Sequence, residues 1–278
     1  MNGRAGGDRG RVAVMGSADV ASAQIPASAR GADGARGANG APSAQVRSMF
    51  ARIAPTYDLL NHLLSMGRDR AWRRLVAANL GPSPQRVLDL CAGTGDLALE
   101  IVRRAPQAAV VSGDFCFEML ARGRDKGLHL RTRPAVCDAL RLPFAAGTFD
   151  AVSVAFGVRN FESVESGLAE IQRVMRPGAT LAVLEFFRRE SPWRDLPFTF
   201  YFRQVLPRVG RIVSRDREAY SYLPRSVGRF VTRVEFENLL QHAGFDDIRR
   251  RELDAGIATL YLARRCRDGA HLASGGTR

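Results

Sequence analysis

The feature that most constrains the fold of this 278-residue chain is a regular alternation of short apolar runs with helical stretches. Strands that alternate with helices predict a parallel sheet covered by helices on both faces. The last two strands are close enough in sequence to pair as a hairpin. The expected strands are 86–90, 109–113, 133–136, 149–154, 180–186, 247–252 and 258–263. The expected helices are 96–105, 117–127, 163–175 and 233–243.

The two ends of the chain differ in composition from its middle. Residues 1–45 have few bulky apolar side chains, and the first aromatic residue is Phe50, so this segment cannot offset its loss of conformational entropy by burial. We expect a disordered tail over 1–45, one domain over 46–265 and a flexible tail over 266–278. Helical spacing from residue 49 to residue 80 predicts an N-terminal helical cap, and an arginine- and aromatic-rich insertion predicts a lid over 187–230.

Charge and cysteine content narrow the chemistry. The net charge is +13, and Lys126 is the single lysine beside 40 arginines, an imbalance that we attribute to genomic composition. The sequence contains no run of about 18 consecutive apolar residues, so we expect no membrane-spanning helix. The four cysteines form no C-x-x-C pair, so we expect neither a zinc site nor a disulfide framework, no other metal, and a reducing cytoplasm as the location.

The sequence LDLCAGTGD, at positions 88–96, follows the first expected strand and opens a helix, as nucleotide-binding loops do. Gly93 and Gly95 permit unusual backbone dihedrals and a close approach of a ligand. Cys91 stands where the usual G-x-G-x-G loop has its first glycine. We expect this small side chain to pack rather than to react, because no adjacent motif lowers its pKa.

Two carboxylates follow the next two strands. Asp114 ends the second strand, 19 residues after Gly95, where a carboxylate can accept both hydroxyls of a ribose. Asp138 follows the third strand, where it can accept an adenine amino group. Together they predict an adenosine-containing ligand at the carboxyl ends of the strands. No third glycine completes G-x-G-x-x-G, which disfavours a NAD-dependent dehydrogenase.

The sequence RVMRPGATLAVLEF (173–186), a helix that ends in x-P-G before an apolar strand, resembles class I S-adenosylmethionine-dependent methyltransferases. The chain also resembles the ubiquinone/menaquinone biosynthesis C-methyltransferase family over roughly residues 46–264. This similarity rests on FARIAPTYDLLNHLLSMGRDRAWRR (50–74), FGVRNF (156–161), VLPRVG (205–210) and YSYLPRSV (220–227). It implies an α/β, Rossmann-like fold with a mostly parallel seven-stranded sheet, helices on both faces and a C-terminal β-hairpin.

The resemblance implies S-adenosyl-L-methionine as the cofactor and C-methylation of a prenylated quinol in respiratory quinone biosynthesis as the reaction. Demethylmenaquinol is the expected substrate, and the 2-polyprenyl-6-methoxy-1,4-benzoquinol of ubiquinone synthesis is the alternative. The expected cofactor-binding residues are Gly93, Thr94, Gly95, Asp114, Asp138 and Ala139.

Four residues are candidates for the chemistry. Arg159 follows the fourth strand, and its permanent charge can stabilise a phenolate as it forms. His62 has an intrinsic pKa suited to proton transfer and shares a helix face with Asp58. Tyr57 is expected to close over the cofactor or to bond the quinol, and Asn160 to orient a ring oxygen. The alternatives are a surface ion pair for Arg159 and a structural role for His62.

The candidate partners are the polyprenylated quinol, an anionic membrane surface that the lid arginines touch transiently, and a second copy of the chain. The expected location is the cytoplasm, at the inner face of the membrane. An isoelectric point of 10.9 is compatible with an RNA methyltransferase, but no [DN]-P-P-[YFW] motif follows the fourth strand, and we expect no nucleic acid. A non-catalytic cofactor-binding accessory protein is the remaining alternative, and the intact loop with both acids argues against it.

Overall fold

The computed structural model describes residues 43–188 and 217–267. Positions 1–42 of the expected N-terminal tail, 189–216 of the expected lid and 268–278 of the expected C-terminal tail lie outside the described residues. The first helix, α1, spans Ser43–Ile53, so it begins before the domain boundary expected at residue 46.

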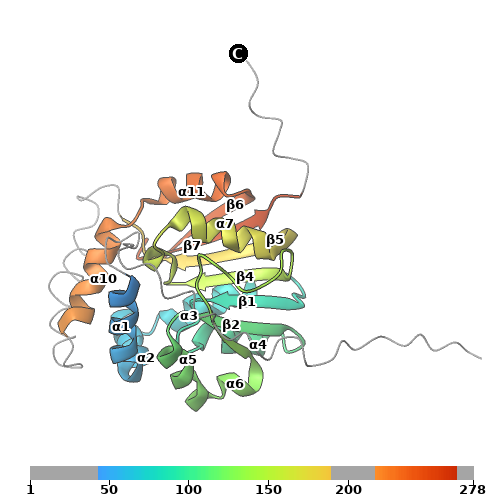
Figure 1. The fold of residues 1–278 in the computed structure, drawn as a ribbon. Helices are drawn as coiled ribbons and strands as arrows, with labels where there is room; N and C mark the ends of the chain where they lie inside the picture. Colours follow the sequence, from blue (N-terminus) through green and yellow to red (C-terminus); the bar gives the residue numbers. More distant parts are fainter. Residues whose placement is uncertain (1–42, 189–216, 268–278) are drawn as a thin grey trace, which may run out of the picture. The chain divides into compact units, whose positions relative to one another are not determined.

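Seven strands form one sheet in the order β3-β2-β1-β4-β5-β7-β6 (Figure 1). Strands β1 to β5 are parallel, β7 runs antiparallel to β5, and β6 pairs antiparallel with β7. The mostly parallel sheet and its C-terminal hairpin are therefore confirmed. The bounds are Arg86–Leu90 for β1, Ala109–Asp114 for β2, Arg133–Val136 for β3, Phe149–Ala155 for β4, Met175–Glu185 for β5, Phe245–Leu253 for β6 and Ala258–Arg265 for β7.

Helices cover both faces of the sheet. One face forms a core with α7 and α11 through Leu168 and Phe236, and the other forms a core with α3 and α4 through Val76 and Ile101. None of the described helices is long and apolar enough to cross a membrane. The bounds are Asp69–Ala78 for α3, Asp96–Arg104 for α4, Phe117–Gly123 for α5, Leu128–Arg131 for α6, Val164–Val174 for α7 and Arg233–His242 for α11.

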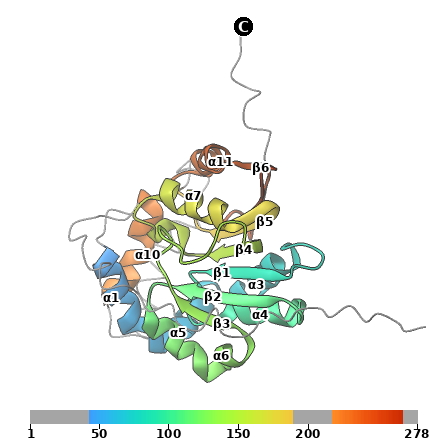
Figure 2. The ribbon, with the colours of Figure 1, turned by 45° about the vertical axis from the view of Figure 1, so that its right-hand side comes forward.

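Three further helices form a cap: α1, α2 (Tyr57–Leu64) and α10 (Arg217–Arg229). Helices α1 and α10 lie side by side in both views (Figures 1 and 2), and α2 follows α1 through the short turn η2 (Ala54–Thr56). The ring of Phe50 in α1 meets the rings of Tyr57 and Tyr222 edge-on, with centroids 6.1 and 6.3 Å apart. Helix α10 also contacts η4 (Val158–Asn160), the short turn that follows β4. The cap therefore lies at the carboxyl ends of the strands, where open α/β sheets bind ligands.

The helical stretch expected over 59–80 is two helices. Helix α2 ends at Leu64, and Met66 and Gly67 follow in the left-handed region with φ of 52° and 75°. Periodicity does not reveal this break, because apolar residues continue at helical spacing on both sides of it. The helix expected over 117–127 likewise ends at Gly123 and is followed by a 3-10 turn, η3 (Arg124–Lys126).

One contact between distant parts of the chain fastens α3 to the C-terminal hairpin. Trp72 Nε1 donates to Asp254 Oδ2 at 2.5 Å, across 182 residues, and Arg68 bonds the other oxygen of the same carboxylate. Asp254 lies in the turn between β6 and β7. The Trp72 ring also lies 6.2 and 6.3 Å from the rings of Phe156 and Phe186, which follow β4 and β5.

We expect the substitution Phe236→Ala to lower the free energy of unfolding by about 3–5 kcal/mol. The Phe236 ring is fully buried, and its centroid lies 5.1 and 5.2 Å from those of Phe187 and Tyr261, so truncation leaves a cavity in the core. Urea denaturation followed by circular dichroism measures the change. The control is Val234→Ala on the same helix, where the side chain is 50% exposed and the expected change is about 0.5 kcal/mol or less. Equal stability of the two variants would contradict this account of the core.

Candidate active site

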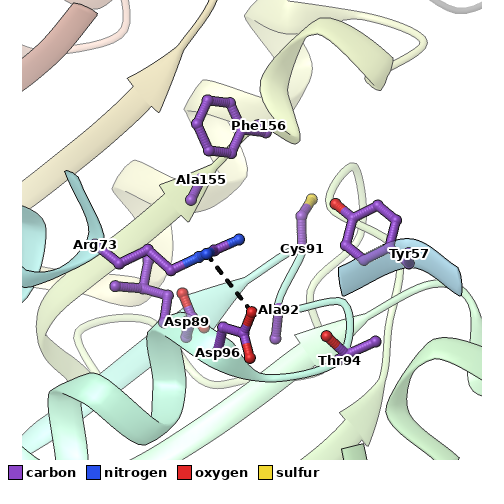
Figure 3. Close-up of a pocket in the computed structure, with 10 residues that line it drawn as sticks. Tyr57, Arg73, Asp89, Cys91, Ala92, Thr94, Asp96, Ala155 and Phe156 are labelled. Carbon is purple, nitrogen blue, oxygen red and sulfur yellow. Dashed lines mark ion pairs between the residues drawn. The ribbon is translucent and has the colours of Figure 1, made fainter. Parts of the chain in front are cut away.

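A small pocket opens at the carboxyl ends of β1 and β4, beside the loop that joins β1 to α4 (Figure 3). Strand β1 pairs with β2 on one side and with β4 on the other, so the strand order reverses here. Open α/β sheets bind ligands at such a reversal. The lining residues come from cap helix α2, helix α3, the ends of β1 and β4, the loop and the first turn of α4: Tyr57, Arg73, Asp89, Cys91, Ala92, Thr94, Asp96, Leu97, Ala155 and Phe156.

The loop takes left-handed dihedrals at three positions: φ is 58° at Cys91, 58° at Gly93 and 86° at Gly95. Glycine adopts this conformation without strain. At Gly95 a side chain would also meet Leu128, because an added Cβ would lie 2.4 Å from a Leu128 methyl carbon. The two glycines therefore shape the loop, and their direct contact with a cofactor remains a prediction.

Cys91 adopts the left-handed conformation although it carries a side chain. A Cβ placed on Gly157 would lie 2.4 Å from the Cβ of Cys91, so the bare glycine makes room for the thiol. Burial raises the pKa of the Cys91 thiol well above its usual value, which keeps the group protonated. The role of Cys91 in this structure is packing.

Asp114 ends β2 and lies beneath the loop, 6% exposed. Its two carboxylate oxygens accept the backbone N–H groups of Gly93 and Cys116, each at 2.8 Å. Burial raises the pKa of Asp114 to about 6, and these hydrogen bonds limit the rise. A carboxylate oxygen can accept more than one hydrogen bond, so Asp114 keeps the capacity to accept hydroxyls such as those of a ribose.

Asp138 and Ala139 lie in the turn after β3, outside the residues that line the pocket of Figure 3. Asp138 is exposed, and its Oδ1 accepts the N–H of Leu140 at 2.9 Å, while Ala139 is buried. The preceding residue, Cys137, donates its N–H to the carbonyl of Asp114 at 3.0 Å. This bond ties the turn to the end of β2, so the two acids identified from the sequence belong to adjacent strand ends.

Asp89 and Arg73 line the pocket, and sequence analysis did not select them. Asp89 is 1% exposed; its Oδ1 accepts the hydroxyl of Ser153 at 2.7 Å, and its Oδ2 has no partner among the described residues. Burial raises the pKa of Asp89 to about 7. Arg73 is buried, pairs with Asp69 and lies 3.5 Å from Asp96. A carboxylate with a vacant oxygen beside a guanidinium suits a ligand end that carries both an ammonium and a carboxylate.

The signal for these two residues in the sequence is weak. Asp89 interrupts the buried strand run 87–90, and an acid inside such a run is the one feature that would have singled it out. Arg73 follows a tryptophan in an amphipathic helix that carries three other arginines or acids within five positions, so nothing in the spacing distinguishes it.

The hydroxyl of Thr94 is engaged within the protein. It donates to Asp58 Oδ1 at 2.5 Å and accepts from Lys126 Nζ at 2.8 Å. The side chain therefore joins the loop to helix α2, and the expected cofactor contact of Thr94 remains a prediction.

Tyr57 borders the pocket on the side opposite Arg73 and Asp89 (Figure 3). Burial raises the pKa of its hydroxyl, and the positive charge of Arg159 is among the influences that oppose this rise. Asn160 lies on η4, and its Oδ1 accepts the hydroxyl of Tyr222 from α10 at 2.5 Å. The structure thus brings Tyr57 and Asn160 to the boundary between the cap and the strand ends.

His62 lies on α2 but outside the pocket. Its Nδ1 is 2.7 Å from Asp69 Oδ2, and its Nε2 accepts from Arg70 at 3.3 Å. Both ring nitrogens are therefore engaged in contacts that join α2 to α3. These contacts favour the structural alternative for His62.

Arg159 is buried behind the pocket, 6% exposed, and forms an ion pair with Glu185 in which the nitrogen and oxygen lie 2.6 Å apart. The alternative of a surface ion pair is therefore wrong: Arg159 does form an ion pair, but the pair is buried. Burial raises the pKa of Glu185, and the charge of Arg159 opposes that rise. Arg159 also donates to the carbonyl of Phe156 at 2.8 Å, and its guanidinium lies 5.9 Å from the centroid of Phe186.

Phe156 lines the pocket, and its carbonyl accepts a hydrogen bond from Arg159, which is not among the lining residues. Phe156 has a left-handed φ of 59°, which is rare for a bulky residue, and its ring stacks on Phe186 with centroids 4.7 Å apart. Strained backbone of this kind concentrates at functional sites. The described ranges contain no group of three or more His, Cys, Asp or Glu residues that would hold a metal ion.

Comparisons with known proteins agree with this geometry. The model of the ubiE/COQ5 methyltransferase family matches residues 38–265. The chain is 47% identical to a demethylmenaquinone methyltransferase of Deinococcus radiodurans, over 78% of this chain and 91% of the relative. It is 38% identical to a ubiquinone/menaquinone biosynthesis C-methyltransferase UbiE of Dinoroseobacter shibae, over 78% of this chain and 88% of the relative.

A solved structure of an S-adenosylmethionine-dependent methyltransferase from Thermotoga maritima, described as a possible histamine N-methyltransferase, has the same fold with a TM-score of 0.55. The two are 15% identical, over 78% of this chain and 98% of that chain. The strand order, with the pocket at the β1–β4 reversal, is that of the class I methyltransferase fold. The chain belongs to the ubiE/COQ5 methyltransferase family, and its methyl donor is S-adenosyl-L-methionine.

The raised pKa of Asp89 predicts how stability changes with pH. The folded protein holds the Asp89 proton up to about pH 7, whereas the unfolded chain releases it near pH 4. Unfolding therefore releases this proton between these values, and the contribution of Asp89 to stability falls as the pH rises through them, by up to about 1.4 kcal/mol per pH unit. Asp89→Asn should remove this contribution and make the slope of stability against pH more positive than in the unmodified protein. The contributions of Asp114 and Glu185, and the opposite ones of Asp58 and Asp69, remain in both proteins.

Urea denaturation of the cofactor-free protein between pH 4.5 and pH 7.5 measures both slopes. Asp125→Asn, at a side chain that is 64% exposed, is the control and should keep the slope of the unmodified protein. An unchanged slope in Asp89→Asn would show that this carboxyl is already ionised below pH 7.

Proposed function

We propose that the chain methylates a ring carbon of a prenylated quinol, and that demethylmenaquinol is its substrate. The observation that carries the proposal is the family match together with similarity to relatives named demethylmenaquinone methyltransferase, one of which is covered over its full length at 46% identity. The benzoquinol of ubiquinone synthesis is the second candidate, because other relatives carry the name ubiquinone/menaquinone biosynthesis C-methyltransferase.

The residues in and beside the pocket fit the cofactor. Asp89 Oδ2 and Arg73 line the pocket and would meet the ammonium and carboxylate of its methionine end. Asp114 lies outside that lining, bonded to the N–H of Gly93, and would meet the ribose hydroxyls. Asp138 and Ala139 would border the adenine, with Gly93, Thr94 and Gly95 along the backbone between these ends. When bound, the cofactor supplies an electrophilic methyl group on a cationic sulfur.

The acceptor is a ring carbon, which becomes nucleophilic when the neighbouring hydroxyl loses its proton. A phenol has a pKa of about 10, so the phenolate is populated at about 0.1% at pH 7, a penalty of roughly 4 kcal/mol. Transfer forms the bond from methyl to ring carbon and breaks the carbon–sulfur bond. The ring carbon then releases its own proton, which restores the aromatic ring.

The side chains at the boundary of the cap and the strand ends support phenolate formation. We assign to Arg159, which contacts the Phe156 carbonyl and lies near the Phe186 ring, the positive charge that stabilises the phenolate oxygen. Tyr57 and Asn160 orient the quinol oxygens. Among the four candidates, His62 has the weakest support, because its ring nitrogens bond within the α2–α3 contact.

The apolar prenyl tail suggests a substrate that resides in a membrane. The sequence 188–233 contains eleven arginines and four acidic residues. Arg233 is buried and Arg188 pairs with Glu235, so neither is counted toward a membrane surface. Each arginine that does approach an anionic lipid surface contributes about 1 kcal/mol. We therefore propose peripheral contact with the cytoplasmic face of the membrane. Assembly into a homodimer and the absence of nucleic acid partners remain predictions.

Purified protein incubated with methyl-labelled cofactor should transfer label to reduced demethylmenaquinone, and the product should carry the methyl group on carbon. Reduced 2-polyprenyl-6-methoxy-1,4-benzoquinone and total RNA are the parallel substrates, and mass spectrometry identifies each product. Efficient labelling of the benzoquinol alone would reassign the substrate, and labelling of RNA alone would overturn the proposed reaction.

A test of the role of Arg159 must also neutralise Glu185, because removing Arg159 leaves the charge of Glu185 without its partner. Removing Arg159 alone leaves a fully buried carboxylate without its partner, so a loss of folding would hide a catalytic effect. We therefore expect the neutral pair Arg159→Gln with Glu185→Gln to bind the cofactor normally and to methylate about 10²–10³-fold more slowly. Both kcat and kcat/KM for the quinol should fall together.

The matched control is Glu185→Gln alone, which keeps the positive charge and should retain most of the rate in its folded fraction. Because this variant leaves the buried guanidinium without its carboxylate, circular dichroism first measures the folded fraction of both variants, and rates are compared per folded molecule. Single-turnover transfer and cofactor calorimetry on the same preparations separate chemistry from binding. Turnover of the double variant near that of the unmodified protein would make Arg159 structural and would direct attention to Tyr57.

A further inference from the structure

Lys126 makes three contacts with three different parts of the fold. Its Nζ lies 2.7 Å from Asp58 Oδ2 on α2 and 2.8 Å from Thr94 Oγ1 on the loop. It also contacts Asp96 Oδ1 in the first turn of α4. The side chain is 26% exposed, so these contacts are partly withdrawn from water.

The chemistry of this contact suits lysine and not arginine. An ammonium carries three donors on one atom and has no acceptor, and Lys126 has three acceptors within reach. A guanidinium spreads its donors over a planar fork and cannot bring three of them to one point. The chain uses arginine at 40 of its 41 basic positions, so a lysine here indicates that arginine does not serve.

The contacts of Lys126 join the cap to the pocket. Asp58 directly follows Tyr57, whose ring lies 3.6 Å from the position of a Cβ on Gly93. Thr94 and Asp96 both line the pocket. The hydroxyl of Thr94 donates to Asp58 at 2.5 Å, so the ammonium and this hydroxyl together attach α2 to the loop.

Removing the ammonium would unbalance the local charge. Asp58 and Asp96 would then face each other across the loop, with Arg73 as the nearby cation, and Arg73 already pairs with Asp69. Like charges at this separation repel, and the repulsion acts between α2 and α4. Among the described contacts between α2 and the cofactor loop, Lys126 is therefore the group that neutralises both acids, while the Thr94 hydroxyl supplies a second hydrogen bond to Asp58.

We propose that Lys126 is a positioning residue that holds cap helix α2 against the cofactor loop and thereby keeps Tyr57 at the edge of the pocket. This inference rests on one part of the proposed function, the binding of the cofactor in the pocket, and does not depend on the identity of the quinol. Lys126 acts through Asp58, Thr94 and Asp96, and its effect is on cofactor affinity and residence time.

The test compares Lys126→Met, Lys126→Arg, Asp58→Asn and the double variant Lys126→Met with Asp58→Asn. Calorimetry gives the Kd and stoichiometry for S-adenosyl-L-methionine in the absence of quinol, and stopped-flow displacement gives its dissociation rate. We expect Lys126→Met and Asp58→Asn each to raise Kd about tenfold or more, mainly through faster dissociation. Lys126→Arg should recover only part of the affinity, and the double variant should be no worse than the single ones.

The control is Arg122→Met, which breaks the exposed Arg122–Asp125 ion pair in the same segment and should bind like the unmodified protein. A purely structural role would lower the stoichiometry of binding while leaving the Kd of the folded fraction unchanged, and that result would overturn the proposal. Full affinity in Lys126→Arg, or additive losses in the double variant, would overturn it as well.

If Lys126→Met does not fold, the comparison of Lys126→Arg with Asp58→Asn carries the test. Binding is measured without quinol, so failure of the quinol assay would reject the proposed substrate and leave this test intact.

Discussion

Removal of carboxylates from water at the carboxyl ends of the strands is the constraint on which the rest of this structure depends. Asp69, Asp89, Asp114 and Glu185 are each 6% exposed or less, and each must be compensated where it lies. Arg73 compensates Asp69 and Arg159 compensates Glu185, whereas Asp89 and Asp114 receive only a hydroxyl and backbone N–H groups. The arrangement of cap, loop and strand ends follows from supplying these partners.

This difference in compensation separates structural acids from ligand-binding acids. A carboxylate paired with a guanidinium has its charge satisfied within the chain, and Asp69 and Glu185 accordingly join elements to one another. A carboxylate whose hydrogen bonds come only from neutral donors can still bind a cation or a hydroxyl. Burial raises the pKa of Asp89 to about 7 and that of Asp114 to about 6. These are the two acids that the proposed cofactor would complete.

The sequence predicts local features here better than contacts between distant residues. The starts of β1, β2, β3, β4 and β7 coincide with the expected ones. At β4, for example, the apolar run begins at Phe149 directly after the turn residues Gly147 and Thr148. The sequence predicts Asp114 as a ligand-binding acid because it ends a strand 19 residues after Gly95. It does not predict the burial of Arg159, because the partner Glu185 lies 26 residues further on and only the fold brings the two side chains together. The sequence does not predict the contacts of Lys126 for the same reason, since its acceptors lie 30 or more residues away.

The hydrogen bond from Trp72 to Asp254 sets an order of events during synthesis of the chain. Trp72 leaves the ribosome early, but its partner follows 182 residues later, when nearly all of the domain has been made. Until then α3 lacks its hold on the hairpin turn, and the aromatic contacts among Trp72, Phe156 and Phe186 lack their outer support. A chain that ends before residue 254 therefore lacks both this hydrogen bond and strand β7, so the final packing of α3 depends on contacts of long sequence separation, which form slowly.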